Sequence, residues 1–132
     1  MRKFWQRKKY SMEEGIKGRA ESIVTPDKTA ISMKSGNLPV YATPAVVALM
    51  EQASYESVAP YLEDGEATVG VSMEVKHIAA THENRKVWAE STLTAVDGRR
   101  LLFEVIAYDE DKCIAKGSHE RVVINIEKFM GK

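Results

Sequence analysis

Apolar and polar residues alternate along much of the chain after residue 66. Residues 69–77 read Val-Gly-Val-Ser-Met-Glu-Val-Lys-His, with an apolar residue at every second position until His77. Because successive side chains of a strand point to opposite faces, this pattern predicts a strand with one apolar face. His77 has the parity of the apolar residues and is expected to point toward the core, whereas Gly70 has the opposite parity. The residues predicted to line the inward face are Val69, Val71, Met73 and Val75.

Two further strands form a predicted hairpin. Residues 87–96 and 101–108 both alternate, and Asp97-Gly98 between them is a typical two-residue hairpin turn. The side chains predicted to face inward are Val87, Ala89, Ser91, Leu93 and Ala95 in the first strand and Leu101, Phe103, Val105 and Ala107 in the second.

The pattern also predicts a first and a last strand. Residues 15–25 alternate loosely and end at Pro26, which cannot donate to a sheet ladder. Residues 113–126 follow a turn at residues 109–112, and this strand is long enough to bend, with Gly117 as the expected bulge point.

Residues 41–62 contain the one long helix that the sequence predicts. Thr43 is a suitable N-cap because its hydroxyl can accept a hydrogen bond from a free amide of the first turn, and Pro44 suits the first helical position. Residues 45–50 are apolar on every side, which is typical of a buried helix. Glu51 then places a carboxylate among apolar neighbours, which is costly unless the charge is paired. Such a conflict between pattern and chemistry indicates a functional position.

The predicted fold class is α+β. One strand, a long buried helix and four strands joined largely by hairpins fit one antiparallel sheet of about five strands wrapped around a central helix. Such a sheet covers only one side of the helix, and its edge strand carries unpaired backbone groups. A homodimer, or a higher oligomer, is therefore expected to bury the remaining surface.

Composition and charge exclude several classes of function. The 132 residues fit one domain, and a formal net charge of zero gives no overall attraction to nucleic acid or to an acidic membrane. Cys113 is the only cysteine, so neither an intrachain disulfide nor a cysteine metal cluster can form. The histidines are well separated, and no metal site is predicted. No apolar run resembles a signal peptide or a membrane span, so we expect a cytoplasmic location.

The start of the chain is basic and aromatic. Its basic residues, with no acid among them, are Arg2, Lys3, Arg7, Lys8 and Lys9. An arm that binds RNA or a membrane surface is one interpretation, but so short a run is a weak motif. We interpret residues 1–14 as a basic N-terminal extension and residues 15–132 as the folded domain.

A set of short segments runs in a fixed order through the predicted elements. These segments are Thr43 with Leu-Met-Glu51, Ala-Pro-Tyr-Leu-Glu-x-Gly-Glu66, His77 with Ala-Ala-Thr81, Val-Asp-Gly-Arg-Arg100, Gly-Ser-His-Glu-Arg121 and Ile-Glu-Lys-Phe129. The order of elements resembles the hotdog fold, and the ordered segments resemble the fluoroacetyl-CoA thioesterase-like family. The likeness covers nearly all of residues 15–129, and the set is more specific than any one segment.

The resemblance implies a homodimeric acyl-CoA thioesterase with the catalytic residues Thr43, Glu51 and His77. CoA is then part of the substrate, and no cofactor is expected. Thioester hydrolysis needs a nucleophile or a held water, a base, and donors for the oxyanion. A histidine suits proton transfer near neutral pH, so His77 is the candidate base. Thr43 is a candidate nucleophile or water-holding group, and Glu51 a candidate for orienting His77 or bearing the acyl group.

Two further residues are candidates for substrate binding. Gly70 would let a thioester approach the backbone closely, and Arg121 is a candidate for contact with a CoA phosphate. Residues 27–40 lead into the helix and are expected to cover one end of the pocket, yet they contain no Phe, Tyr or Trp. A pocket that favours a fluorinated acyl group over its isostere would need rigid apolar walls, so a different short acyl group is the predicted substrate.

Each candidate also has a purely structural interpretation. These interpretations are N-capping for Thr43, a partly exposed helix carboxylate for Glu51, a strand-end histidine satisfied by backbone for His77, a bulge for Gly70 and a surface ion pair for Arg121. The resemblance favours the catalytic roles of the first three. His82 and His119 are interpreted as loop or surface residues, and Cys113 as a small core residue.

The alternative function is a non-catalytic acyl-CoA-binding module of the same fold. A dehydratase is disfavoured because no Asp is followed by His five positions later, and the His-Gly-Gly motif of another hotdog thioesterase type is absent. An RNA-binding role would depend on the basic extension alone. An acyl-CoA thioesterase therefore remains the preferred prediction, with acyl-CoA as the expected partner.

Overall fold

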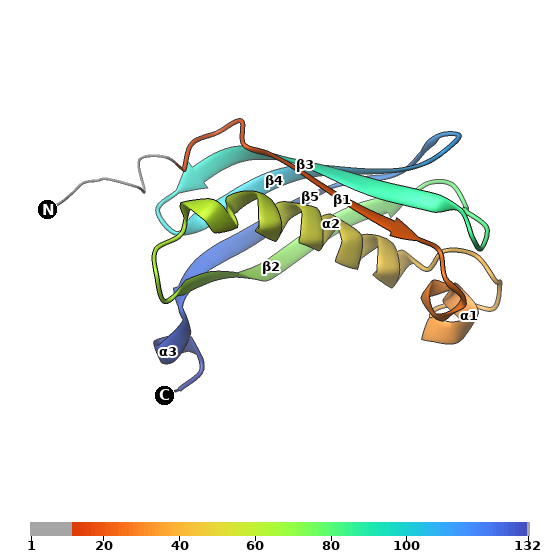
Figure 1. The fold of residues 1–132 in the computed structure, drawn as a ribbon, viewed down its shortest axis with the longest axis horizontal. Coiled ribbons are helices and arrows are strands. Elements are labelled where there is room, and N and C mark those ends of the chain that lie inside the picture. Colours follow the sequence, from red (N-terminus) through yellow and green to blue (C-terminus); the bar gives the residue numbers. More distant parts are fainter. Residues whose placement is uncertain (1–11, 132) are drawn as a thin grey trace, which may run out of the picture.

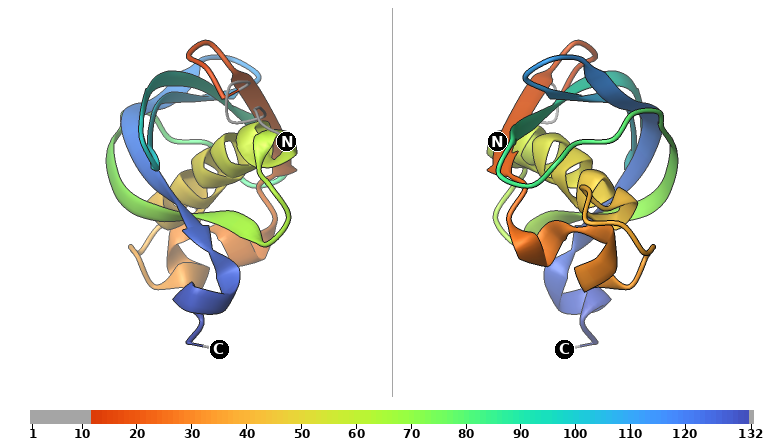
Figure 2. Two further views of the ribbon diagram at one scale, coloured as in Figure 1. Left: turned by 90° about the vertical axis from the view of Figure 1, so that its left-hand side faces the viewer. Right: turned by 90° about the vertical axis from the view of Figure 1, so that its right-hand side faces the viewer.

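The computed structural model describes residues 12–131, which form a five-stranded antiparallel sheet with one long helix across its concave face (Figures 1 and 2). The strand order is β1-β3-β4-β5-β2, so β1 and β2 are the edges. The strands are β1 (Lys17–Ile23), β2 (Glu66–His77), β3 (Lys86–Asp97), β4 (Arg100–Asp109) and β5 (Cys113–Asn125). The predicted α+β class and the number of strands are confirmed. Most of the predicted extension, residues 1–11, lies outside the described residues.

The long helix α2 spans Thr43–Val58 and is roughly 24 Å long at about 1.5 Å per residue. It is shorter than the predicted 41–62, because the chain tightens into a 3₁₀ turn at Ala59–Tyr61. The short helices are α1 (Ala30–Met33), which precedes α2, and α3 (Ile126–Phe129), which follows β5. Among residues 12–131 no helix has the length and apolarity that crossing a membrane requires.

The predicted N-cap at Thr43 is wrong. Ala42 occupies the N-cap position, and no side chain bonds the free amides there. Thr43 is already the first helical residue, so its hydroxyl cannot turn back to cap the first turn. Pro44 falls within the first two helical positions, where its missing N–H costs nothing.

Only one side of α2 is buried in the single chain, as expected for a helix covered by one sheet. The buried residues, which face the sheet, are Ala45, Val46, Leu49, Met50, Ala53, Ser54 and Val58. On the other side Ala48 is exposed and Tyr55 is 45% exposed, because the sheet reaches around only one side of the helix. Apolar side chains on this side of α2 are therefore left open to solvent.

The inward faces of β3 and β4 follow the predicted alternation except at Ala95. A register shift between Leu93 and Ala95 pairs Val96 with the buried Leu101, so the inward assignment of Ala95 is wrong. In β3 the residues from Val87 to Leu93 that were assigned inward are buried, and in β4 Leu101, Phe103, Val105 and Ala107 are buried. The apolar side chains among them belong to the core that packs under α2, together with residues of α2, β1 and β5. Burial of this apolar surface holds the helix on the sheet.

The alternation of β2 breaks at a bulge directly after Gly70, the residue for which a bulge was the structural interpretation. Gly70 lies opposite Arg121 and Ser72 opposite Glu120, so Val71 has no partner and is 55% exposed. A bulge inserts one residue and reverses the faces that follow it. Met73 therefore faces inward as predicted, whereas the inward assignment of Val69 and Val71 is wrong.

Gly117 was expected to be a bulge, but it pairs regularly with Val75 and Val105. A Cβ at this position would overlap the carbonyl oxygen of Glu74 on the neighbouring strand, so glycine allows close approach of two backbones. The irregularity of β5 lies instead at Ile114, between the pairs formed by Cys113 and Ala115.

A buried carboxylate joins the β4–β5 turn to the segment before α2. Asp109 accepts hydrogen bonds from Thr81 Oγ1 and Lys112 Nζ, both at 2.8 Å, and from the backbone amides of Asp111 and Lys112. The carbonyl of Thr81 in turn accepts from the amide of Tyr41 at 2.9 Å, two residues before α2. Burial alone would raise the pKa of Asp109, but these hydrogen bonds lower it to about 2.

Substituting Asp109→Asn should lower the free energy of unfolding by roughly 1–3 kcal/mol, because buried donors then lose their charged acceptor. The folded-state pKa lies below the ordinary 3.8, so this stabilisation is present above pH 4 and is lost as pH falls from about 4 to about 2. Urea denaturation of both proteins across this pH range measures the effect. Parallel pH curves for the two proteins would contradict it.

Candidate active site

Thr43 and His77 meet at one end of α2. Thr43 is the first residue of α2 and His77 the last of β2, and the helix crosses the sheet so that these two ends lie together. The hydroxyl of Thr43 lies 2.8 Å from Nδ1 of His77. Two of the predicted catalytic residues, 34 positions apart in the chain, are thus a hydrogen-bonded pair.

The environment of His77 suits a general base. Its Nε2 is buried and has no hydrogen-bond partner among residues 12–131. Burial lowers the pKa of His77, an effect that a backbone group of Ala79 partly offsets, so the neutral ring is favoured near neutral pH. When the ring proton is on Nε2, Nδ1 accepts the hydrogen of the Thr43 hydroxyl. This is the direction of proton transfer that activates a hydroxyl or a water.

A cavity of about 290 Å³ opens beside this pair. Its lining residues are Ala30, Ser35, Val40, Tyr41, Thr43, His77, Ile78, Ala79 and Ala80. The segment with α1 forms one wall, as predicted for residues 27–40, and the segment after β2 forms the other. The positive end of the α2 dipole points to this cavity, which favours developing negative charge there.

Glu51 lies away from this cavity. It follows Thr43 by eight residues, which is about 12 Å along the helix axis. Its Oε2 lies 3.5 Å from Nη1 of Arg121, and its side chain is 41% exposed. A Cβ on Gly70 would stand 2.6 Å from the same Oε2, so only glycine allows this approach. Glu51, Gly70 and Arg121 therefore form a second cluster, near the middle of α2.

Arg121 is buried, with 6% of its surface exposed. Its Nε donates to Thr68 Oγ1 at 2.8 Å and its Nη2 to the carbonyl of Thr68 at 3.1 Å. Burial lowers the pKa of Arg121, and the charge of Glu51 opposes that shift. The surface ion pair considered for this residue is not what the structure contains, and its guanidinium faces Glu51 rather than open solvent.

His119 is a functional candidate that the sequence analysis missed. It was assigned to a loop or the surface, but it lies on β5 with 3% of its surface exposed. Its Nδ1 is 2.8 Å from the carbonyl of Ser72, to which it donates, and its Nε2 accepts from Arg121 Nη1 at 3.1 Å. Burial lowers the pKa of His119, consistent with a neutral ring. The sequence did offer one indication of this position. His119 and Arg121 are two residues apart on the same predicted strand, so their side chains lie on the same face.

The remaining assignments are mixed. His82 is exposed, as predicted. Cys113 is half-buried rather than a core residue. The part of the chain that the structure describes contains no group of three or more His, Cys, Asp or Glu that could hold a metal ion.

Comparison with known proteins identifies the family of this chain. The family model described as fluoroacetyl-CoA-specific thioesterase matches residues 24–127. The chain belongs to this family. A member from Streptantibioticus cattleyicolor, the fluoroacetyl-CoA thioesterase, is 39% identical over 130 residues and covers 94% of each chain. The predicted family is confirmed.

Solved structures of the fluoroacetyl-CoA-specific thioesterase family superpose closely on this chain. A mutant of its member FlK in complex with fluoroacetate and CoA matches with a TM-score of 0.82 and 38% identity, over 89% of this chain and 99% of that one. A thioesterase superfamily member from Thermus thermophilus matches with a TM-score of 0.84 and 30% identity, over 91% and 89%. The predicted hotdog fold is confirmed.

Replacing Thr43 by Ala should change the free energy of unfolding by no more than about 0.5 kcal/mol, because the exposed hydroxyl bonds His77 and caps no helix amide. Urea denaturation of Thr43→Ala beside Thr43→Ser tests this. If Thr43→Ala loses about 1 kcal/mol of the free energy of unfolding and Thr43→Ser does not, the hydroxyl of Thr43 caps α2 after all.

Proposed function

We propose that this chain is an acyl-CoA thioesterase that hydrolyses a short-chain acyl-CoA to the free acid and CoA. The observation that carries the proposal is the hydrogen bond between Thr43 and His77 beside a small cavity at the start of α2. The family relationship supports the same reaction, because the relative from Streptantibioticus cattleyicolor is a fluoroacetyl-CoA thioesterase.

In the proposed reaction His77 takes a proton at Nδ1, either from the Thr43 hydroxyl or from a water that this hydroxyl holds. The oxygen that loses the proton attacks the thioester carbonyl, and the positive end of α2 stabilises the negative charge on the carbonyl oxygen. His77 then returns the proton to the sulfur of the departing CoA. If water is the attacking group, the free acid is released when CoA leaves. If Thr43 is the attacking group, a water then hydrolyses the acyl ester on Thr43 and releases the acid.

Glu51 completes the proposed catalytic set only in a dimer. Within one chain it is about 12 Å from Thr43 along the helix axis, too far to touch His77. The edge strand β2 exposes Val71, and the open side of α2 exposes Tyr55. We propose that two β2 edges pair antiparallel, so that Glu51 of the partner subunit approaches the Thr43–His77 pair.

Gly70 and Arg121 are proposed to position the carboxylate of Glu51. Gly70 leaves room for Glu51 and for a thioester beside the backbone. The donors of Arg121 are engaged by Thr68, His119 and Glu51, which favours a role in orienting Glu51 over contact with a CoA phosphate. Since every step uses these side chains and water, CoA enters only as part of the substrate.

The acyl group is proposed to be short. A cavity of about 290 Å³ lies at the low end of the range for ligand sites. The segment of residues 27–40 that walls it contains no aromatic residue, so it lacks rigid walls that would distinguish a fluorinated acyl group from its isostere. Acetyl-CoA and propionyl-CoA are therefore the first substrates to test.

Assaying a panel of acyl-CoA thioesters for free thiol should show turnover of the short members. The substitution His77→Ala should lower kcat by roughly 10²–10⁴-fold, and Glu51→Gln should also lower it with little change in packing. Since burial lowers the pKa of His77, activity should persist below pH 6.5 and fall as the ring is protonated. His82→Ala, at an exposed histidine, is the matched control. Acyl-CoA binding without turnover would favour the non-catalytic module.

Light scattering should show a dimer at micromolar concentration. The substitution Val71→Lys should weaken it, because a charge at the centre of the β2 edge opposes pairing. Ile23→Lys, on the opposite edge strand β1, should leave the dimer intact. A wild-type monomer, or equal loss of the dimer in both variants, would rule out pairing through β2.

A further inference from the structure

Three apolar side chains stand exposed on and just after α3. Ile126 is 43% exposed, Phe129 57% and Met130 62%, and we call these three residues the α3 patch. The patch is held beside the start of β2, because Asn125 pairs with Glu66 and the amide of Ile126 donates to the carbonyl of Gly65 at 2.9 Å. An apolar cluster on a firmly placed element is a candidate contact surface.

A second exposed apolar group lies on the segments that wall the Thr43–His77 cavity. Ile31 is 51% exposed, Leu38 60% and Ile78 59%, and we call these three residues the cavity rim. Ile78 itself lines the cavity, and Ile31 belongs to α1, whose first residue Ala30 also lines it. Leu38 lies beside Ile31, since its carbonyl accepts from the amide of Ile31 at 3.3 Å, so both walls of the cavity carry exposed apolar side chains.

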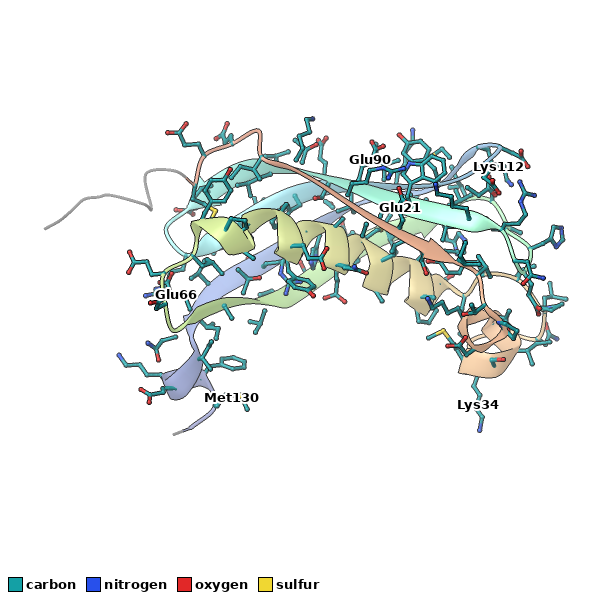
Figure 3. All side chains as sticks on the ribbon, in the orientation of Figure 1. Glu21, Lys34, Glu66, Glu90, Lys112 and Met130 are labelled. Carbon is teal, nitrogen blue, oxygen red and sulfur yellow. The ribbon has the colours of Figure 1, made fainter. Side chains whose placement is uncertain are left out.

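The two surfaces lie at opposite ends of the same edge strand. β2 has 12 residues and is about 40 Å long at roughly 3.3 Å per residue, so they cannot touch within one chain. In Figures 1 and 2, α1 and α3 both extend past the β2 edge on the same side. Figure 3 shows Lys34 at the end of α1 and Met130 after α3 pointing away beyond this edge, one at each end.

Antiparallel pairing of two β2 edges sets the start of one strand opposite the end of the other. A twofold axis near Val71 would therefore carry α3 of each subunit to the α1 end of its partner. We propose that the α3 patch of the partner subunit packs on the cavity rim and closes the Thr43–His77 cavity. The proposal rests on the proposed dimeric thioesterase and assigns α3 a part in its active site.

This contact adds a large apolar side chain to the cavity. Tyr41 is the aromatic residue among those that line it within the chain, and residues 27–40 contribute none, whereas Phe129 is a large apolar group outside the core of its own chain. Phe129 of the partner subunit then forms an apolar wall of the acyl pocket and excludes water beside the thioester. Pocket size, and with it the length of the accepted acyl group, would depend on both subunits.

Cross-linking tests the contact independently of activity. Leu38→Cys and Phe129→Cys are combined in a Cys113→Ser background and treated with a short bismaleimide. We expect a covalent dimer, because the two positions are too far apart to react within one chain. The control pairs Leu38→Cys with Val96→Cys, an exposed residue at the α3 end of the molecule but away from the β2 edge. No covalent dimer, or an equal yield from the control, would overturn the proposal.

Kinetics test the wall. Phe129→Ala should lower kcat/KM for the preferred short acyl-CoA by roughly tenfold while the dimer persists, and Val96→Ala should not. Unchanged kinetics would remove Phe129 from the pocket. If the wild type hydrolyses acyl-CoA but no α3 cross-link forms, the contact fails and the thioesterase stands. A cross-link without any hydrolysis would retain the contact and reject the proposed function.

Discussion

One extra residue in β2, Val71, decides which side chains of that strand reach α2. Gly70 and His77 are seven positions apart, an odd number that would place them on opposite faces of a regular strand. The bulge at Val71 takes one residue out of the alternation, so Gly70 faces Glu51 and His77 faces Thr43. Both polar clusters along α2 therefore depend on an unpaired residue at the open edge of the sheet.

A buried guanidinium organises the cluster at the middle of α2. Taking the charge of Arg121 out of water is costly, and the cost is offset by two acceptors from Thr68, the ring of His119 and the carboxylate of Glu51. Because Nδ1 of His119 donates to a backbone carbonyl, its Nε2 is free to accept from Arg121. One side of the Glu51 carboxylate is thereby held, while the side chain stays 41% exposed and accessible to a substrate or a second subunit.

The two clusters are separated along one rigid helix, which is why the proposed catalytic set requires a dimer. Helical geometry keeps Glu51 about 12 Å from Thr43 within a chain, and no side-chain rotation closes that gap. A second copy, paired through β2, would bring a carboxylate to the Thr43–His77 pair and apolar cover to its cavity. Catalysis and assembly would then use the same exposed edge.

Local patterns in the sequence determined the α+β class, the Asp97-Gly98 hairpin and the inward faces of β3 and β4, because these follow from alternation and turn chemistry. The pattern also marked Glu51, whereas the resemblance to a known family implied Thr43, Glu51 and His77 as a catalytic set. Only the tertiary structure decided that Thr43 bonds His77 instead of capping α2, that His119 is buried, and that Glu51 stands apart. The position of a bulge residue cannot be read from the alternation of apolar and polar residues along a strand. Contacts between distant strands and a helix form only once the chain has folded.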